Sequence, residues 1–163
     1  MLSAILITSI INMLAQAVAT ATRATSLQLA VCGLHLRGQP LNSQLTDLQA
    51  VFVRDCKSAA EYKLYAFTDD TGKTKPGMVT VVDGSGSAVY LEVWEMPIEN
   101  FGHFILQVPP PLAIGTVKLE DGSSVKGFVC EGWVAESCKA GAANVEDITH
   151  LGSWLTYLVR PQQ

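Results

Sequence analysis

Leu29-Ala-Val-Cys-Gly-Leu-His-Leu-Arg-Gly-Gln-Pro-Leu-Asn-Ser-Gln-Leu45 joins a strand, a glycine-bracketed loop and the beginning of a helix. The apolar run over residues 27–32 predicts a buried strand. The loop that follows ends at Pro40, and Ser43 is a suitable N-cap for a helix that we expect to run to about residue 56. The segment therefore predicts a strand, a polar loop and a helix in direct succession.

Strands outnumber helices in the rest of the chain, and turn signals separate them. The expected elements are a strand (62–67), a hairpin (78–82 with 88–95), a helix (97–107), a second hairpin (114–119 with 125–130) and a final helix (147–159). Strands that pair as hairpins, with helices between them, are typical of an α+β domain. We therefore predict a small mixed β-barrel with flanking helices.

The composition indicates one globular domain. The chain has 163 residues, of which 48% are hydrophobic and 16% charged, and its formal net charge is −4. A disordered chain would be poorer in apolar residues and richer in charge. No cluster of Lys or Arg is present, so the sequence predicts no nucleic-acid partner.

Residues 1–26 form an apolar leader that differs from the rest of the chain. Residues 1–22 contain no charged side chain, and residues 20–26 are small and polar apart from Arg23. Three interpretations stay open for the leader: an amphipathic helix, a secretory signal without the usual basic start, and a membrane anchor. The first predicts a cytoplasmic protein and the others a secreted or membrane-anchored one. We expect the folded domain to span residues 27–159, followed by a tail at 160–163.

Several kinds of site are excluded by the motifs. The four cysteines and three histidines lack zinc-ligand spacing, so no metal site is expected. Glycine-rich nucleotide-binding loops and the Gly-x-Ser-x-Gly nucleophile motif are missing. A disulfide between Cys130 and Cys138 is conceivable only if the chain is exported.

The loop after the first strand carries the most informative polar residues. Gly33 and Gly38 bracket His35 and Arg37. Glycine lets the backbone approach a ligand, and Arg can bind a carboxylate with two parallel hydrogen bonds. Histidine titrates near neutral pH and can donate or accept a proton. By itself, however, a His and an Arg in a surface loop are more often without a function than with one.

Several ordered blocks of the chain resemble the C-terminal domain of allophanate hydrolase. They are the opening 29–45 segment, Tyr62-Lys-Leu-Tyr-Ala66, Glu92-Val-Trp-Glu-Met-Pro97, Pro109-Pro-Pro-Leu-Ala-Ile-Gly-Thr-Val117, Ser124-Val-Lys-Gly-Phe-Val-Cys-Glu131 and Asp147-Ile-Thr-His-Leu-Gly-Ser-Trp154. The resemblance covers residues 27–159 and implies a γ-glutamylcyclotransferase-like fold. It also implies a role in urea degradation, where the amidase domain converts allophanate to N-carboxycarbamate and the C-terminal domain promotes its decarboxylation.

The resemblance also implies a set of site residues. The family's pocket histidine corresponds to His35. The resemblance implies a cofactor-free decarboxylase in which this histidine protonates the substrate nitrogen. We expect a small anionic substrate and no metal or organic cofactor. The substrate-binding residues that we expect around His35 are Gly33, Leu34, Leu36, Arg37, Gly38, Asn42, Tyr65 and Trp94.

Two departures from the family pattern limit the expected activity. The 163 residues leave no room for an amidase domain, so hydrolysis of allophanate itself is not expected. Cyclotransferases of this fold use a Glu where this chain has Pro109-Pro110-Pro111, so that activity is not expected either. Two alternatives stay open: a non-catalytic module that binds an amidase partner or self-associates, and a different small-molecule reaction in the same pocket.

Overall fold

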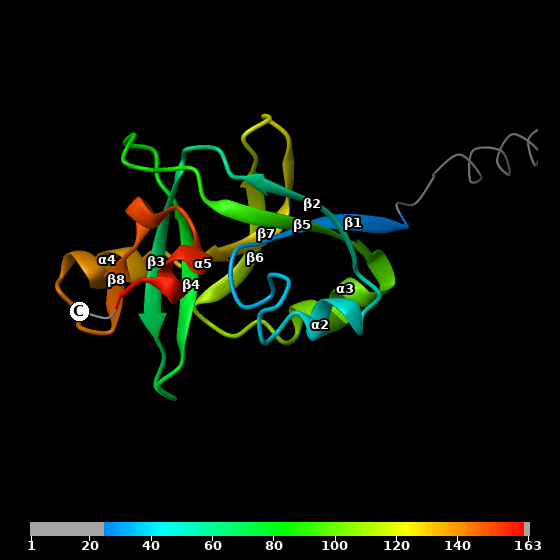
Figure 1. The fold of residues 1–163 in the computed structure, drawn as a ribbon, viewed down its shortest axis with the longest axis horizontal. Helices are drawn as coiled ribbons and strands as arrows, with labels where there is room; N and C mark the ends of the chain where they lie inside the picture. Colours follow the sequence, from blue (N-terminus) through cyan, green and yellow to red (C-terminus); the bar gives the residue numbers. More distant parts are fainter. Residues whose placement is uncertain (1–24, 162–163) are drawn as a thin grey trace, which may run out of the picture.

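The computed structural model describes residues 25–161, so residues 1–24 of the apolar leader and residues 162–163 of the tail lie outside the described part (Figure 1). The elements are β1 (Ser26–Val31), α2 (Ser43–Thr46), β2 (Val51–Lys57), β3 (Tyr62–Thr68), β4 (Thr74–Thr80), β5 (Tyr90–Pro97), α3 (Ile98–Ile105), β6 (Leu112–Lys118), β7 (Ser124–Cys130), α4 (Trp133–Lys139), β8 (Val145–Asp147), the 3-10 turn η1 (Thr149–Leu151) and α5 (Trp154–Val159).

The strands form two sheets. The larger one has the order β2-β5-β1-β7-β6, in which β1 runs parallel to β7 and antiparallel to β5. The smaller one has the order β4-β3-β8 and is antiparallel throughout. This mixed arrangement with few helices confirms the predicted α+β class, although the two sheets do not close into one barrel.

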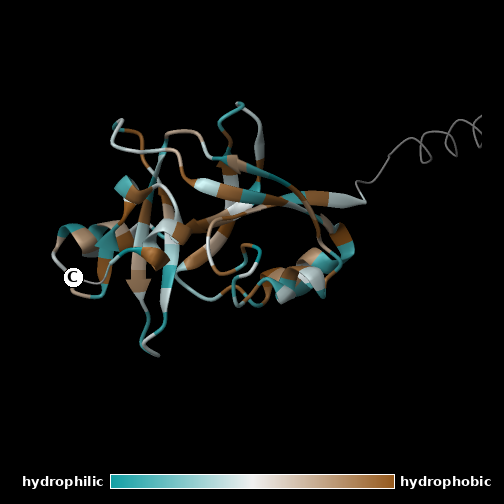
Figure 2. Cartoon of the chain, in the orientation of Figure 1, coloured by the Kyte–Doolittle hydropathy of each residue, from teal (hydrophilic) through white to brown (hydrophobic). Residues whose placement is uncertain are grey.

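Strand β1 lies at the centre of the larger sheet, and its second half is apolar on both faces. Leu29, Ala30 and Val31 are all buried, as the continuous apolar run predicted. Leu29 and Val31 belong to one apolar cluster and Ala30 to another. Figure 2 shows the hydrophobic residues concentrated on the strands of both sheets. The end of β1 is therefore held rigidly from two sides.

The two sheets meet where glycines allow close packing. A Cβ atom on Gly33, just after β1, would lie 2.2 Å from Cγ of Pro76 on β4. A Cβ atom on Gly77 would lie 2.8 Å from Sγ of Cys130 on β7. A Cβ atom essentially never lies within 3.0 Å of a neighbouring carbon or sulfur atom, so only glycine lets β4 pack this closely. This packing brings the start of β4 against the loop after β1.

The helix predicted over residues 43–56 is wrong in its second half. Helix α2 ends at Thr46, and Gln49 then adopts a left-handed conformation with φ of 60°, which turns the chain. Residues 51–57 form β2, which pairs with β5. The exposed and less exposed residues of β2 alternate, and its Val51 and Val53 favour a strand. The spacing of the apolar residues in this segment fits a helix as well as a strand. Pairing with β5 determines that the segment forms a strand.

The hairpin predicted over residues 78–95 is also wrong. Strand β4 begins at Thr74 and pairs with β3, whereas β5 pairs with β1 and β2 in the other sheet. The Asp83–Gly86 turn therefore connects two sheets instead of two neighbouring strands. The second predicted hairpin is confirmed, since β6 pairs with β7 from Leu112↔Cys130 to Lys118↔Ser124.

The final helix is shorter than predicted. Residues 145–147 form β8 beside β3, and the carboxylate of Asp147 accepts a hydrogen bond from the backbone N–H of Thr149. Gly152 then takes a φ of 62°, and Ser153 caps the N-terminus of α5 by accepting a hydrogen bond from the N–H of Leu155. This left-handed residue and cap limit the helix to Trp154–Val159.

Cys130 and Cys138 are both free thiols, so the conceivable disulfide is not formed.

Candidate functional site

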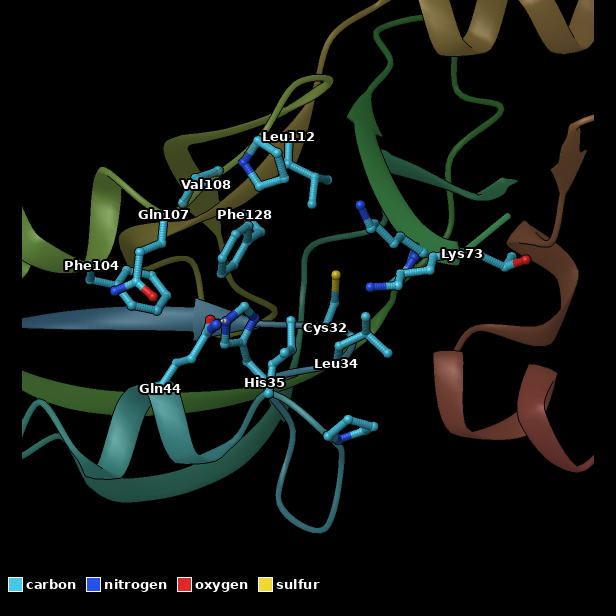
Figure 3. Close-up of a pocket in the computed structure, with 17 residues that line it drawn as sticks. Cys32, Leu34, His35, Gln44, Lys73, Phe104, Gln107, Val108, Leu112 and Phe128 are labelled. Atoms are coloured by element: carbon cyan, nitrogen blue, oxygen red, sulfur yellow. Dashed lines mark hydrogen bonds between the residues drawn. The ribbon is translucent and has the colours of Figure 1, made fainter. Parts of the chain in front are cut away.

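A cavity of about 530 Å³ lies where the loop after β1 meets the start of β4 and the segment between α3 and β6. Its walls are mostly apolar, formed by Leu34, Leu41, Phe104, Val108, Leu112 and Phe128. Its polar side chains are placed at two ends. In Figure 3, His35 and Gln44 lie with Phe104 and Phe128 on one side, and Lys73 lies on the opposite side.

The imidazole of His35 is held between aromatic rings. It stacks on Phe128 with a centroid distance of 5.0 Å and meets the edge of Phe104 at 5.3 Å. Its Nε2 lies 2.9 Å from Oε1 of Gln44. If Nε2–H donates to this oxygen, Nδ1 is left as an acceptor in the neutral ring. Burial lowers the pKa of His35, against the opposing effect of the Gln44 hydrogen bond, and so favours the neutral ring.

Backbone hydrogen bonds give the His35 loop its shape. The N–H of Leu36 donates to Gly33 O, and the N–H of Leu41 donates to Leu34 O at 2.9 Å. The side chain of Asn42 donates to the carbonyl of His35 at 2.8 Å. Asn42 therefore supports the loop through its backbone and is not part of the cavity lining.

The positive charges at the cavity come from the end of the turn between β3 and β4 and from the start of β4. Lys73 and Lys75 both line the cavity. The carboxylate of Asp69 forms an ion pair with Lys75 and accepts hydrogen bonds from the N–H groups of Thr71 and Lys73. These interactions hold the pKa of Asp69 well below its usual value, and the interaction with Lys75 has the largest effect. Among residues 25–161, Lys73 Nζ forms no ion pair, so its charge is available to an anionic ligand.

Arg37 does not line the cavity, and two carboxylates neutralise it. Its Nε donates to Glu92 at 3.0 Å, and its Nη2 donates to Asp55 at 2.7 Å. The guanidinium carbon also lies 3.7 Å from the ring centroid of Phe52. The hydrogen bond to Glu92 is the largest of the effects that raise the pKa of Arg37. The guanidinium that the loop sequence offered to a ligand carboxylate is thus already bound to carboxylates of the protein.

The structure brings only part of the predicted site to the cavity. Gly33, Leu34 and His35 line it, whereas Leu36, Arg37, Gly38, Asn42, Tyr65 and Trp94 do not. Leu36 and Trp94 belong to the apolar cluster around β1, and Tyr65 to the cluster beneath α4. Gly38 has a φ of 77° and serves the turn.

Sequence reasoning missed Gln44, Lys73, Lys75 and Gln107, which all line the cavity. Gln44 lay within the segment expected to be an ordinary helix face. The two lysines lay in a polar loop that looked like a solvated turn. The one available signal was the Lys73-Thr-Lys-Pro76 segment, in which two cations precede a proline.

The described part of the chain contains neither a metal-binding cluster nor a helix that could cross a membrane. Residues 25–161 contain no group of three or more His, Cys, Asp or Glu side chains arranged to hold a metal ion. The helices of the same range include none with the length and hydropathy needed to cross a membrane.

Known proteins resemble this chain over nearly all of the described part. The urea amidolyase of Saccharomyces cerevisiae is 42% identical over 133 residues, which make up 82% of this chain and 7% of that protein. The S177A variant of Kluyveromyces lactis allophanate hydrolase is 40% identical with a TM-score of 0.76, and the match covers 84% of this chain and 22% of that one. The chain thus corresponds to a small part of these relatives.

A second kind of relative has a similar length. The structure of a uropathogenic E. coli-specific protein is 36% identical with a TM-score of 0.71, and the match covers 85% of this chain and 99% of that one. A gamma-glutamyl cyclotransferase matches at 14% identity with a TM-score of 0.50, which confirms the predicted type of fold and nothing more.

The family model for the allophanate hydrolase C-terminal domain matches residues 27–159. These are the residues over which the ordered sequence blocks were found. The chain belongs to the allophanate hydrolase C-terminal domain family.

Proposed function

We propose that the cavity binds N-carboxycarbamate and promotes its decarboxylation, with His35 as the proton donor. The observation that carries this proposal is the position of His35, which is fixed on one side of a cavity with Lys73 on the opposite side. The Gly-Leu-His-x-Arg-Gly segment of the family supplies this histidine. We name N-carboxycarbamate as the substrate because this chain resembles allophanate hydrolases, and their amidase reaction would form that compound.

The reaction needs one proton and no cofactor. Loss of carbon dioxide breaks one C–N bond, and the electron pair of that bond stays on nitrogen. The nitrogen takes a proton from the His35 imidazolium, which leaves carbamate and the neutral ring. A bound dianion favours the imidazolium because an opposite charge nearby raises the pKa of histidine. We expect His35 to take a proton from solvent as the substrate binds and to pass it to the substrate nitrogen.

The apolar walls and Lys73 act on different stages of this reaction. Lys73, which forms no ion pair among residues 25–161, offsets part of the free energy needed to remove a dianion from water. The apolar walls destabilise a carboxylate but accept carbon dioxide, which carries no charge. The cavity therefore favours the step in which one carboxylate becomes neutral.

The direct test is the rate of carbon dioxide release. A separate amidase generates N-carboxycarbamate from allophanate, and release is timed with the parent chain, with His35→Ala and with His103→Ala. His103 is exposed on α3 and outside the cavity, so it is the matched control. We expect His35→Ala to lose about 10²-fold or more of the acceleration, as is usual when a general acid is removed. Equal rates for the parent chain and His35→Ala would contradict the proposal.

Anion binding has its own test in thermal shift measurements with malonate, a stable dicarboxylate of similar size. Lys73→Met should weaken malonate binding roughly tenfold, about 1.4 kcal/mol, because it removes the unpaired cation at the cavity. Lys126→Met is the control, since Lys126 is exposed on β7 and contacts Thr116. Unchanged affinity in Lys73→Met would remove Lys73 from the site.

A second candidate function is that of a module which assembles with an amidase partner. It is supported by the relatives in which this domain makes up 7% or 22% of a longer chain. Domains of one chain usually share an interface, which a separate copy would present to the same kind of partner. Co-purification with a separately expressed amidase domain, followed by a size measurement, tests this function. Recovery of two free proteins would count against it.

A further inference from the structure

Glu92 on β5 is a buried carboxylate that the proposed reaction does not use. It is 2% exposed and does not line the cavity. Three donors surround its two oxygens. Oε2 accepts from the backbone N–H of Arg37 at 3.0 Å and from Nε1 of Trp94 at 3.1 Å, and Oε1 accepts from Nε of Arg37 at 3.0 Å. A buried charge with this set of partners is stable in the folded protein, although it adds little net stability.

Glu92 lies beside the start of the loop that contains His35 and binds that loop. Glu92 pairs with Val31, the last residue of β1, and with Asp55 on the neighbouring strand β2. Its carboxylate therefore lies beside the point where the loop with His35 leaves the sheet. It binds both the backbone and the side chain of Arg37, two residues after His35. A single carboxylate thus fixes the loop to the central part of the larger sheet.

Two further hydrogen bonds, from residues at the start of α2, hold the same loop. Asn42 donates to the carbonyl of His35, and Gln44 contacts the ring itself. Together with the Glu92–Arg37 pair, these bonds leave the backbone of residues 35–37 little freedom. The ring of His35 is then kept against Phe128, where its stacked geometry depends on the direction of the backbone.

We infer that Glu92 is a positioning residue for His35, and that its pair with Arg37 holds the imidazole against Phe128 at the cavity. The link to catalysis rests on the proposed function. This assigns Arg37 a role different from the one that its place in the loop suggested. Its guanidinium binds the protein's own carboxylates and orients the loop, and Lys73 on the opposite side of the cavity is left to bind the ligand's charge.

The test uses Glu92→Gln, with Glu95→Gln as the matched control. Glu95 lies on the same strand but is exposed, and it accepts a hydrogen bond from Ser26. Glutamine at position 92 keeps one oxygen for the Arg37 N–H, but places an NH₂ group against another donor. The first readout is NMR titration of the His35 ring, which does not depend on any reaction.

In Glu92→Gln we expect the His35 resonances to move and its pKa to rise toward the usual 6.5, because the ring becomes more hydrated. In the decarboxylation assay, kcat should fall about tenfold, equivalent to about 1.4 kcal/mol, while KM stays within about twofold. Glu95→Gln should change neither readout. A folded Glu92→Gln with unchanged His35 resonances and pKa overturns the inference, whatever its activity.

Two further outcomes are decided in advance. If Glu92→Gln does not fold, Arg37→Lys takes its place, since it keeps the charge and the backbone hydrogen bond but loses the guanidinium fork. Unchanged His35 resonances in Arg37→Lys overturn the inference in that case. If the His35 ring responds but the parent chain releases carbon dioxide no faster than the uncatalysed reaction, the positioning role stands and the proposed function fails.

Discussion

Replacing Gly33 with alanine should force apart the two sheets at the edge of the cavity. The added Cβ would lie 2.2 Å from Cγ and 2.9 Å from Cδ of Pro76. Carbon atoms in contact prefer about 3.5 Å or more, so the two segments must separate by about 1.3 Å. The proline ring cannot rotate away as a flexible side chain would. We therefore expect Gly33→Ala to lower the free energy of unfolding by about 1–3 kcal/mol, as is usual for overpacking.

Urea and thermal denaturation measure this effect. A loss of that size should lower Tm by about 3–5 °C per kcal/mol in a domain of this length. Malonate affinity should fall as well, because Gly33 and Pro76 both line the cavity. Gly102→Ala is the matched control: no atom outside its own helix lies within 4 Å of the new Cβ, so a gain of about 0.5–1 kcal/mol is expected.

A double mutant separates the clash from other effects of the substitution. Pro76→Ala removes the ring that the new methyl group would meet, so the second substitution should cost less in the Gly33→Ala background than in the parent. If Gly33→Ala unfolds at the same urea concentration as the parent, close packing does not explain the glycine. Strictly additive losses in the double mutant would refute the proposed clash as their cause.

Three other predictions concern single side chains. Burial lowers the pKa of His35 below 6.5, so the unfolded chain binds the proton first and stability should fall as the pH drops from about 6.5 to the lower folded value; His35→Asn should flatten this part of a plot of urea midpoint against pH. Asp69→Ala should speed hydrogen exchange at the amides of Thr71 and Lys73, because the side-chain oxygen that accepts their N–H groups is lost. Ser153→Ala should lower the free energy of unfolding by about 1 kcal/mol in urea denaturation, since the N-cap of α5 is removed.

Local patterns predicted the elements whose partners follow closely in the sequence. The β6–β7 hairpin was predicted from a turn at Asp121-Gly122 between two apolar runs. Its two strands follow one another in the sequence, with only that turn between them. Helix α3 follows Pro97 and lies within the predicted range 97–107. The segment 51–57 was misassigned because its apolar residues matched a helical face, and its partner β5 lies far along the chain.

The sequence by itself determined the first strand, the glycine-bracketed loop with His35 and the family to which the chain belongs, because these depend on residue order within short segments. Only the tertiary structure decided which cation meets the cavity. Arg37 is two residues from His35, yet it binds a carboxylate 55 positions later on β5. Lys73 is far from His35 in the sequence, yet it lines the same cavity. The direction of each side chain depends on which strands pair and which sheets pack, and the order of residues in one loop does not contain that information.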